Sequence, residues 1–227
     1  MGEEHLQLVT LEEVREPEPP IRLSAGFYDP GSPAGVAAAV RSFDEVVVAI
    51  GAPLGEPGHG RPQRVADELL RSRGVRPAAA SEAALALRHG LPGLASFEPD
   101  SDEVQGPVPE GAFSSGPLIE TNPDAVFCTL QGARLPAKRH PHGMRLRVRE
   151  LLDDHVDDAG GGLWDRRTEE IDAAAAALCA HRYAVGHASW LGDAVEGVIV
   201  LPGTSIPERF ETEGVLAPVE RLRLPEP

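Results

Sequence analysis

Residues 44–60, DEVVVAIGAPLGEPGHG, contain the feature that decides the fold class. The apolar run 46–50 shows no alternation, which is typical of a β-strand covered on both faces. A loop rich in Gly and Pro follows it directly, at residues 51–60. In open α/β sheets, ligands bind beyond the carboxyl ends of strands, so this loop is a candidate position for a site. The loop has neither of the glycine patterns that cradle a nucleotide phosphate.

The segments before this strand extend the same pattern. Residues 6–14 and 21–28, LQLVTLEEV and IRLSAGFY, partly alternate between apolar and polar side chains and predict a hairpin with its turn at 16–20. An Ala-rich helix is expected over 34–42. A strand pair, a helix and a buried strand in succession predict an α/β fold.

The rest of the chain alternates helices with short strands. The pattern is clearest over 168–185, where Thr168 is expected to cap a helix that ends at Gly186. Residues 91–116 have few apolar anchors and are expected to be a surface insertion. Further helices are expected over 62–73, 81–88, 124–130 and 141–152, and strands over 117–123 and 197–202.

The charge balance limits the classes of partner. The chain has 227 residues, with 36 Asp plus Glu against 21 Lys plus Arg and a formal net charge of -15. This excess of acids argues against a general electrostatic attraction to nucleic acid or to an anionic membrane. No apolar run approaches the roughly 20 residues of a membrane span, and the first residues do not resemble a signal peptide. We therefore expect a cytoplasmic protein with no membrane partner.

One local segment is basic. Residues 134–149 contain five arginines and one lysine with no acid. Such a segment could bind the phosphates of a nucleic acid or of a phosphorylated small molecule. The alternative is a solvated helix face that pairs with the acids of 153–158. Lys138 and Arg139 lie on an expected loop, which favours a substrate-binding role for these two.

Three carboxylates are candidates for chemistry. Glu120, in LIETNP, lies at the end of an apolar strand, where carboxylates serve as metal ligands or as acids and bases. Asp172 precedes a run of alanines in TEEIDAAAAALCA, and Glu169 could share its role. Two alternatives stay open: Glu120 could face solvent, and Asp172 could simply complement the helix dipole.

Four segments together resemble a known family. They are VVVAIGAPLGEP, PLIETNP, EEIDAAAAALCAHRYAV and GVIVLP, which span roughly residues 46–202 in this order. The chain resembles the DUF429 family of predicted nucleases with a ribonuclease H-like fold. The resemblance implies one domain over 1–206, in which helices flank a mixed sheet, with an insertion at about 52–116 and an irregular tail over 207–227. It also implies a phosphodiesterase that uses Mg²⁺ or Mn²⁺, held by carboxylates at one edge of the sheet.

The resemblance also implies which residues would form this site. Three acidic positions of the family can be carried over. The aspartate of A-I-D-A-P-L corresponds here to Gly51, the glutamate of I-E-x-x-P to Glu120, and the acid of the final helix to Asp172. Glu120 and Asp172 are thus the expected metal ligands and, with Glu169, the expected catalytic residues. Their carboxyl groups should then lie within about 10 Å of each other, since two bridged metal ions are about 4 Å apart.

This sequence departs from the family at two positions. Gly51 has no carboxylate, and nothing before Leu6 matches the usual opening G-[IV]-D strand, so the sequence is expected to begin at what would be the second strand. Either the true start lies upstream of Met1, which would restore one acid, or the chain is a degenerate member. We therefore expect a nuclease relative with a degenerate metal site and weak or no activity. The alternatives are an active Mg²⁺-dependent nuclease and a non-catalytic scaffold that binds a phosphorylated ligand or a protein.

Overall fold

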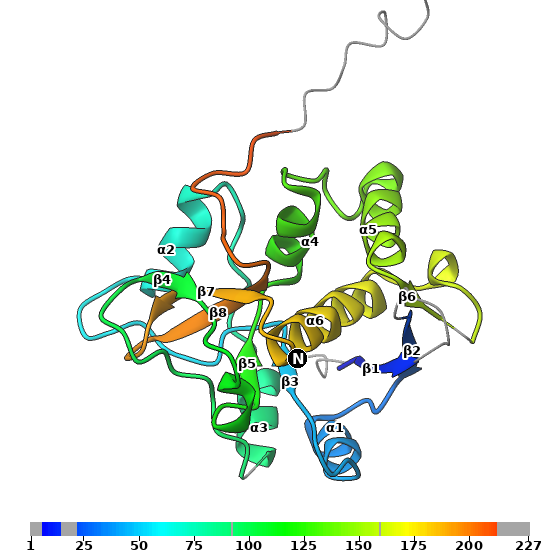
Figure 1. Cartoon of the computed structure of the whole chain (residues 1–227), viewed down its shortest axis with the longest axis horizontal. Coiled ribbons are helices and arrows are strands. Elements are labelled where there is room, and N and C mark those ends of the chain that lie inside the picture. The colour runs from blue at the N-terminus through cyan, green and yellow to red at the C-terminus, as the bar shows by residue number, and fades with distance from the viewer. Residues whose placement is uncertain (1–5, 15–21, 92, 159, 213–227) are drawn as a thin grey trace, which may run out of the picture.

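The computed structural model describes residues 6–14, 22–91, 93–158 and 160–212. It shows a mixed α/β protein in which helices flank two mixed sheets (Figure 1). The first sheet has the order β1-β2-β6 and contains β1 (Leu8–Val14), β2 (Arg22–Tyr28) and β6 (Val156–Asp157). The second has the order β3-β5-β8-β7-β4 and contains β3 (Val48–Ile50), β4 (Gln105–Pro107), β5 (Leu118–Glu120), β7 (Ala188–Asp193) and β8 (Gly197–Pro202).

The helices begin at residues suited to start them. Ser32, Ser81 and Asn122 each accept a hydrogen bond from a backbone N–H of the first turn that follows. The helices of the described residues are α1 (Pro33–Val40), α2 (Val65–Ser72), α3 (Glu82–Gly90), α4 (Pro123–Gln131), α5 (Pro141–Asp153) and α6 (Thr168–Ala184), with short 3-10 turns at Ala112–Ser114 and Leu163–Asp165.

The second sheet is covered on both faces around β3 and β5, which pair in parallel. Alternate residues of a strand point to opposite faces. Leu118 and its neighbour Val48 pack with α1 and α3, whereas Ile119 and its neighbour Ala49 pack with α6. The predicted burial of residues 46–50 is thus met only in part, because Ile50 is buried whereas residues 46–49 are partly exposed.

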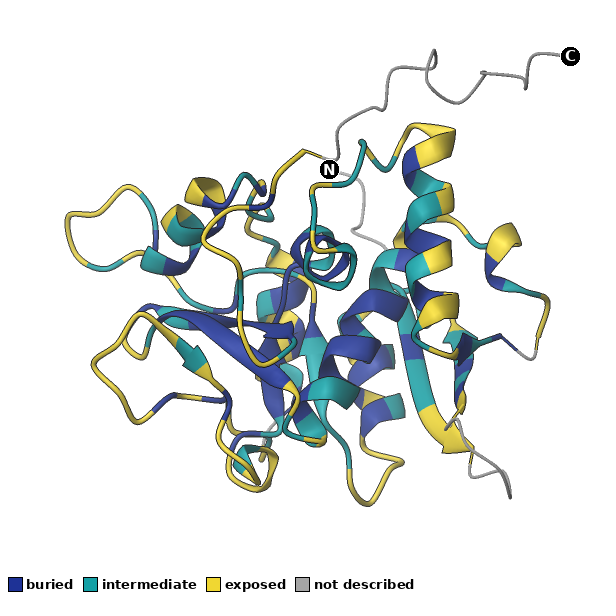
Figure 2. Ribbon diagram, turned by 45° about the horizontal axis from the view of Figure 1, so that its top comes forward, coloured by how far each residue is buried: buried dark blue, intermediate teal, exposed yellow. Residues whose placement is uncertain are grey.

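Helix α6 is the central element of the core. It contacts β1 of the first sheet and β3, β7 and β8 of the second. Ile171, Leu178 and Cys179 are fully buried, and Figure 2 shows much of the helix in the dark blue of buried residues. Because both sheets pack on α6, this helix joins them into one core.

Several expectations are confirmed. β1 and β2 form the predicted antiparallel hairpin, whose turn at 16–20 lies outside the described residues. The expected helices at 34–42, 62–73, 81–88, 124–130 and 141–152 correspond to α1 to α5, with ends shifted by a few residues. Strand β7, which lies between β8 and β4, was not expected, although it pairs with β8 along its whole length.

The start of α6 differs from the expectation. Arg167, not Thr168, is the N-cap, and Thr168 is the first helical residue. The Glu170 carboxylate accepts the backbone N–H of Arg167, which satisfies a donor that the helix itself leaves free. This contact sets the start of the helix one residue earlier than the capping preference of threonine suggests.

Residues 91–116, expected as a surface insertion, are packed at several points. They contain β4, which pairs with β7, and the buried side chains of Phe97 and Val108. The Phe97 ring packs edge to face on Tyr183, with centroids 5.4 Å apart, and the Tyr183 hydroxyl donates to the carbonyl of Gly116. Phe97 thus anchors the segment to α6, and β4 anchors it to the second sheet, whereas Val104 and Phe113 are exposed.

The described start of the expected C-terminal tail is also packed. Phe210 is buried, and its backbone N–H donates to the carbonyl of Arg73. Residues 213–227 lie outside the described residues. Within the described ranges, no helix combines the length and the apolar character that crossing a bilayer requires.

We predict that Leu178→Ala destabilises the protein strongly. The Leu178 side chain of α6 is fully buried, so its loss leaves a cavity in the main core. The free energy of unfolding should fall by about 2–5 kcal/mol in urea denaturation. Leu152→Ala, at a position of α5 that is 40% exposed, is the matched control and should cost clearly less. Equal losses for the two variants would contradict the central role of α6.

Candidate functional site

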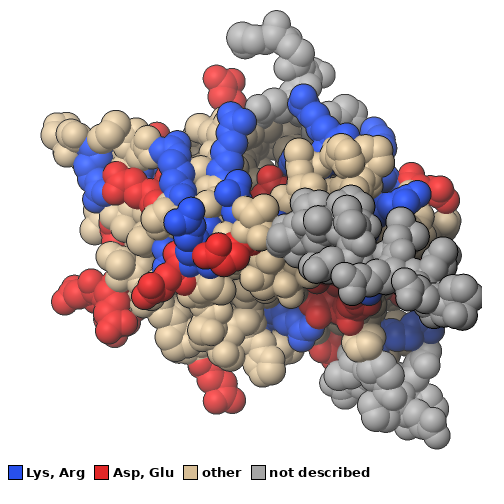
Figure 3. Space-filling model, turned by 90° about the horizontal axis from the view of Figure 1, so that it is seen from above, with Lys and Arg blue, Asp and Glu red and all other residues tan. Residues whose placement is uncertain are grey.

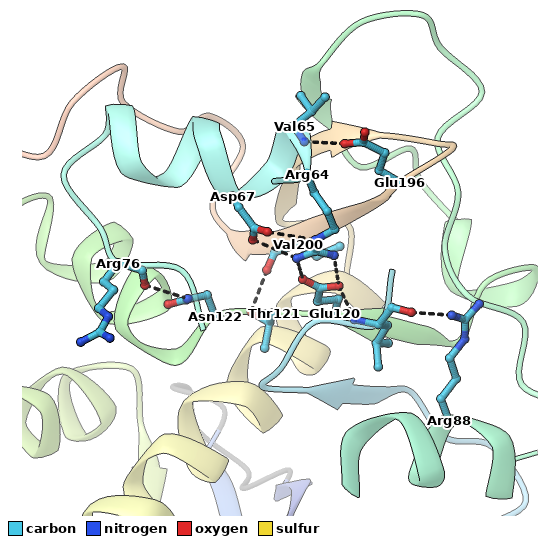
Figure 4. A network of polar contacts seen from close by, with 11 residues as sticks. Arg64, Val65, Asp67, Arg76, Arg88, Glu120, Thr121, Asn122, Glu196 and Val200 are labelled. Atoms are coloured by element: carbon cyan, nitrogen blue, oxygen red, sulfur yellow. Dashed lines mark hydrogen bonds and ion pairs between the residues drawn. The ribbon is translucent and has the colours of Figure 1, made fainter. Parts of the chain in front are cut away.

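Glu120 is the last residue of β5, and its side chain is buried. By the alternation of the strand, it points to the same face as Leu118, away from α6. Figure 4 shows its carboxylate directed toward the start of α2. The solvent-facing alternative for Glu120 is therefore excluded.

Both oxygens of Glu120 are held by hydrogen-bond donors. Arg64 donates from Nη2 to Oε1 at 2.6 Å and from Nη1 to Oε2 at 2.7 Å. The backbone N–H of Leu54 also donates to Oε2, at 2.7 Å. Arg64 itself is only 1% exposed, and its Nε and Nη2 donate to Asp67 as well. This is a bidentate Arg–carboxylate pair inside the protein.

The surroundings of the pair shift the pKa values of both groups upward. Burial lowers the pKa of Arg64, but the hydrogen bonds and charges of Glu120 and Asp67 outweigh burial and raise this pKa above its usual value. Burial raises the pKa of Glu120, and the donors of Arg64 and Leu54 oppose this rise. Since every group that reaches the carboxylate is a donor, the arrangement fits its ionised form.

A second buried carboxylate, Glu196, was not expected from the sequence. It lies in the turn between β7 and β8 and accepts the backbone N–H of Gly58 at 2.7 Å and that of Val65 at 2.6 Å. Val65 is the first residue of α2, where the helix dipole favours a negative charge. A Cβ atom on Gly55 would lie 1.9 Å from the carbonyl oxygen of Glu196, so only glycine fits there.

These contacts fix the Gly/Pro-rich loop beyond β3. Glu120 binds the loop at Leu54, and Glu196 binds it at Gly58 and at the start of α2. The Arg88 side chain donates to the carbonyl of Leu54. The loop lacks a nucleotide-binding pattern, and here its backbone is bound by the protein's own side chains.

Asp172 lies in α6, on the other face of the sheet. Lys138 donates to its Oδ2, while its Oδ1 is buried and has no hydrogen-bond partner among the described residues. Burial raises the pKa of Asp172, and the Lys138 ammonium partly opposes this rise. Asp172 thus points inward, and the alternative of an exposed acid that only complements the dipole is excluded.

A cavity of about 860 Å³ begins beside Asp172. Six residues form the polar part of its lining, and the other lining residues are mostly apolar. The polar end is lined by Gly51, Asn122, Asp124, Lys138, Glu169 and Asp172. Glu120 does not line it.

The structure therefore brings together only part of the expected site. Gly51, Lys138 and Asp172 share one cavity with Glu169, whereas Glu120 lies on the opposite face of the sheet. Within the described ranges, no three His, Cys, Asp or Glu side chains are grouped so that they could hold a metal ion. The oxygens of Glu120 already accept three donors. These donor groups do not fit a two-metal centre.

Some arginines of the basic segment, residues 134–149, make contacts within the protein. Arg147 is buried, donates to Asp124 at 2.8 Å and lies over the Phe127 ring. Arg149 is exposed and lies 3.6 Å from Asp153, which matches the alternative of a solvated helix face. Arg139, by contrast, is exposed on the loop. On the face seen in Figure 3, Lys and Arg side chains lie near Asp and Glu and do not form a continuous basic surface.

The comparisons with known proteins give one match. The family model described as a protein of unknown function, DUF429, matches residues 32–196. No curated protein and no solved structure matches the chain.

We predict that the Arg64–Glu120 pair contributes strongly to stability. Glu120→Gln leaves the buried Arg64 undercompensated and should cost about 3–5 kcal/mol of unfolding free energy. A double-mutant cycle with Arg64→Met should show a large coupling, measured by urea denaturation. The exposed pair Arg61–Glu68 is the matched control, and its coupling should be below about 1 kcal/mol. A coupling energy as small as that of the control would contradict a strong contribution of the Arg64–Glu120 pair to stability.

We also predict that Asp172 titrates above the usual range for an aspartate. Because its pKa is raised in the folded state, it lowers stability as the pH rises through that pKa. Lys138→Met removes the opposing charge, so the pKa should rise further and the loss of stability should grow. Carboxyl ¹³C NMR titration measures the first effect, and denaturation between pH 4 and pH 8 measures the second. Arg139→Met, on the exposed neighbour, should leave both unchanged.

Proposed function

We propose that this chain, which belongs to the DUF429 family, is a relative of predicted nucleases. It would have a ribonuclease H-like fold and weak or no nuclease activity. The central observation is that Glu120, the acid expected to bind metal, is bound at both oxygens by Arg64 and Leu54. A carboxylate that accepts three hydrogen bonds from groups of the protein, out of about four acceptor sites, is a poor metal ligand.

The chemistry of such nucleases explains why this matters. Two divalent ions, held by converging carboxylates, align a water and stabilise the leaving oxygen of an in-line displacement. In this chain Gly51 supplies no carboxylate, and Glu120 and Asp172 lie on opposite faces of the sheet. Of the acids at the polar end of the cavity, Asp172 is paired with Lys138 and Asp124 with Arg147.

The second candidate function is an active Mg²⁺- or Mn²⁺-dependent nuclease. It is favoured by Asp172, whose Oδ1 has no hydrogen-bond partner in the part of the chain that the structure describes and which lines the cavity together with Glu169. Lys138 and Arg139 would then contact substrate phosphates. This function requires Glu120 to leave Arg64, and the cost of exposing that buried charge opposes it.

The third candidate is a non-catalytic protein that binds a phosphorylated ligand or a protein. The exposed Arg134, Arg139 and Arg145 favour it, because they belong to the basic segment and are not buried. Binding of a single-stranded oligonucleotide that weakens on Arg139→Gln, without any cleavage, would separate this function from the nuclease.

We predict that the purified chain does not cleave single- or double-stranded DNA or RNA with Mg²⁺ or Mn²⁺. Fluorescence assays should give the same rate for the chain and for its Glu120→Gln and Asp172→Asn variants. Robust cleavage that is abolished by either substitution would overturn the proposal. Cleavage that survives both would indicate a contaminant.

We further predict that Gly51→Asp alone does not create activity. A Cβ atom at residue 51 would lie 3.1 Å from Cγ of Pro123, so the new side chain starts in a tight position. Glu120 would also remain bound to Arg64. Gly51→Ala is the matched control, because it adds the same Cβ atom without the carboxylate. A rate for Gly51→Asp well above that of Gly51→Ala would contradict this prediction.

A further inference from the structure

One buried arginine connects α4, α5 and the loop 132–140 between them. Arg147 belongs to α5, and its side chain is only 4% exposed. Its Nη2 donates to Oδ1 of Asp124 in α4 at 2.8 Å. Its Nη1 donates to the carbonyl of Pro136 in the loop at 2.9 Å and to that of Gly143 in α5 at 3.0 Å. A single guanidinium group thus joins three segments of the chain.

Two of these segments carry residues of the polar end of the cavity. Asp124 lines the cavity from the first turn of α4. Lys138 lines it from the loop, shortly after the Pro136 carbonyl that Arg147 binds, and donates to Asp172 of α6. The contacts of Arg147 therefore act on the segments that bring Asp124 and Lys138 to the cavity.

The loop lies so close to α5 that residue 143 has no room for a side chain. A Cβ atom on Gly143 would lie 2.3 Å from the carbonyl oxygen of Ala137 and 2.6 Å from that of Pro136. Both distances are far below an ordinary contact, so only glycine allows the backbone to approach this closely. This close approach brings the Pro136 carbonyl within hydrogen-bond distance of Arg147.

The chemistry of arginine suits this task. Its donors lie on separate nitrogens of a planar group, so that one side chain can bind a carboxylate and two carbonyls at once. Lysine carries all its donors on one nitrogen and does not span these acceptors. The Asp124 carboxylate compensates the buried charge, and the guanidinium lies 5.6 Å from the centre of the Phe127 ring.

We propose that Arg147 is a positioning residue of the candidate site: it holds the loop so that the Lys138 ammonium meets Asp172, and it holds Asp124 at the same end of the cavity. The inference deepens the proposed function, because it rests on Lys138 and Asp172 being members of the site. Its test measures the position of Lys138 and involves no cleavage. Either one can therefore fail while the other stands.

Amine labelling tests the proposal on the full chain. The sequence contains a single lysine, so acetylation followed by mass spectrometry of its peptide reports on Lys138 alone. Only a neutral amine is acetylated, and pairing with Asp172 keeps Lys138 protonated and partly buried, so labelling should be slow. Arg147→Met should raise the labelling rate by about fivefold, the scale expected for the loss of one partly buried ion pair.

A double-mutant cycle separates positioning from a merely structural role. Asp172→Asn removes the partner of Lys138 directly and should raise the labelling rate by a similar factor. In the Arg147→Met background, Asp172→Asn should have little further effect, because Lys138 has already left Asp172. If Arg147 acted on stability alone, the two effects would be independent and their factors would multiply.

Two control variants lie on the same helix. Leu151→Ala, at a fully buried position of α5, should lower the Tm but keep the response of Lys138 to Asp172→Asn. Arg145→Met, at an exposed position, should change neither. If Arg147→Met does not fold, Gly143→Ala serves as a second variant, because it keeps the arginine but displaces the loop, and it should reproduce the faster labelling.

Three results would overturn the proposal. The first is an unchanged labelling rate of Lys138 in Arg147→Met and in Gly143→Ala. The second is full multiplication of the effects of Arg147→Met and Asp172→Asn. The third is that Leu151→Ala raises the rate equally and also abolishes the response to Asp172→Asn, since any loss of stability would then have the same effect.

Discussion

The buried carboxylate of Glu120 is the constraint on which the second sheet and its connecting loop depend. Removing a charge from water costs several kcal/mol unless a partner of opposite charge and further donors compensate it. Arg64 and the amide of Leu54 provide this compensation. Because Arg64 immediately precedes α2, the same contact fixes the start of that helix, and because Leu54 lies in the Gly/Pro-rich loop, it also fixes the loop. Glu196 repeats this arrangement from the β7–β8 turn.

The pairing of Glu120 with Arg64 limits the chemistry that this carboxylate can perform at the edge of the sheet. A carboxylate that holds a structural arginine is not free to share a metal ion with Asp172 across the sheet. The other two candidate acids, Asp172 and Glu169, line the cavity beside α6, where Lys138 already pairs with Asp172. In this member of the DUF429 family, the carboxylate at the end of β5 thus has a structural partner.

Helix α6 explains how the two sheets remain in one core without a shared strand. Its buried larger residues contact the second sheet and the neighbouring helices, while its alanines face the cavity between β1 and β3. Small side chains are what a helix presents when a backbone passes close to it. The alanine run, which the sequence alone leaves without a clear role, therefore becomes the wall of a space whose other sides are strand edges and apolar helices.

Local chemistry in the sequence determined the α/β class, the β1–β2 hairpin, the strand beyond Val46 and most helix positions, because apolar periodicity and capping residues act over a few neighbours. It also singled out Glu120 and Asp172 as unusual acids, since each interrupts an apolar segment. Only the tertiary structure decided their partners, because Arg64 and Lys138 are 56 and 34 residues away along the chain. For the same reason Glu196 was missed: it follows no local pattern, and its burial results from packing between elements that are far apart in sequence.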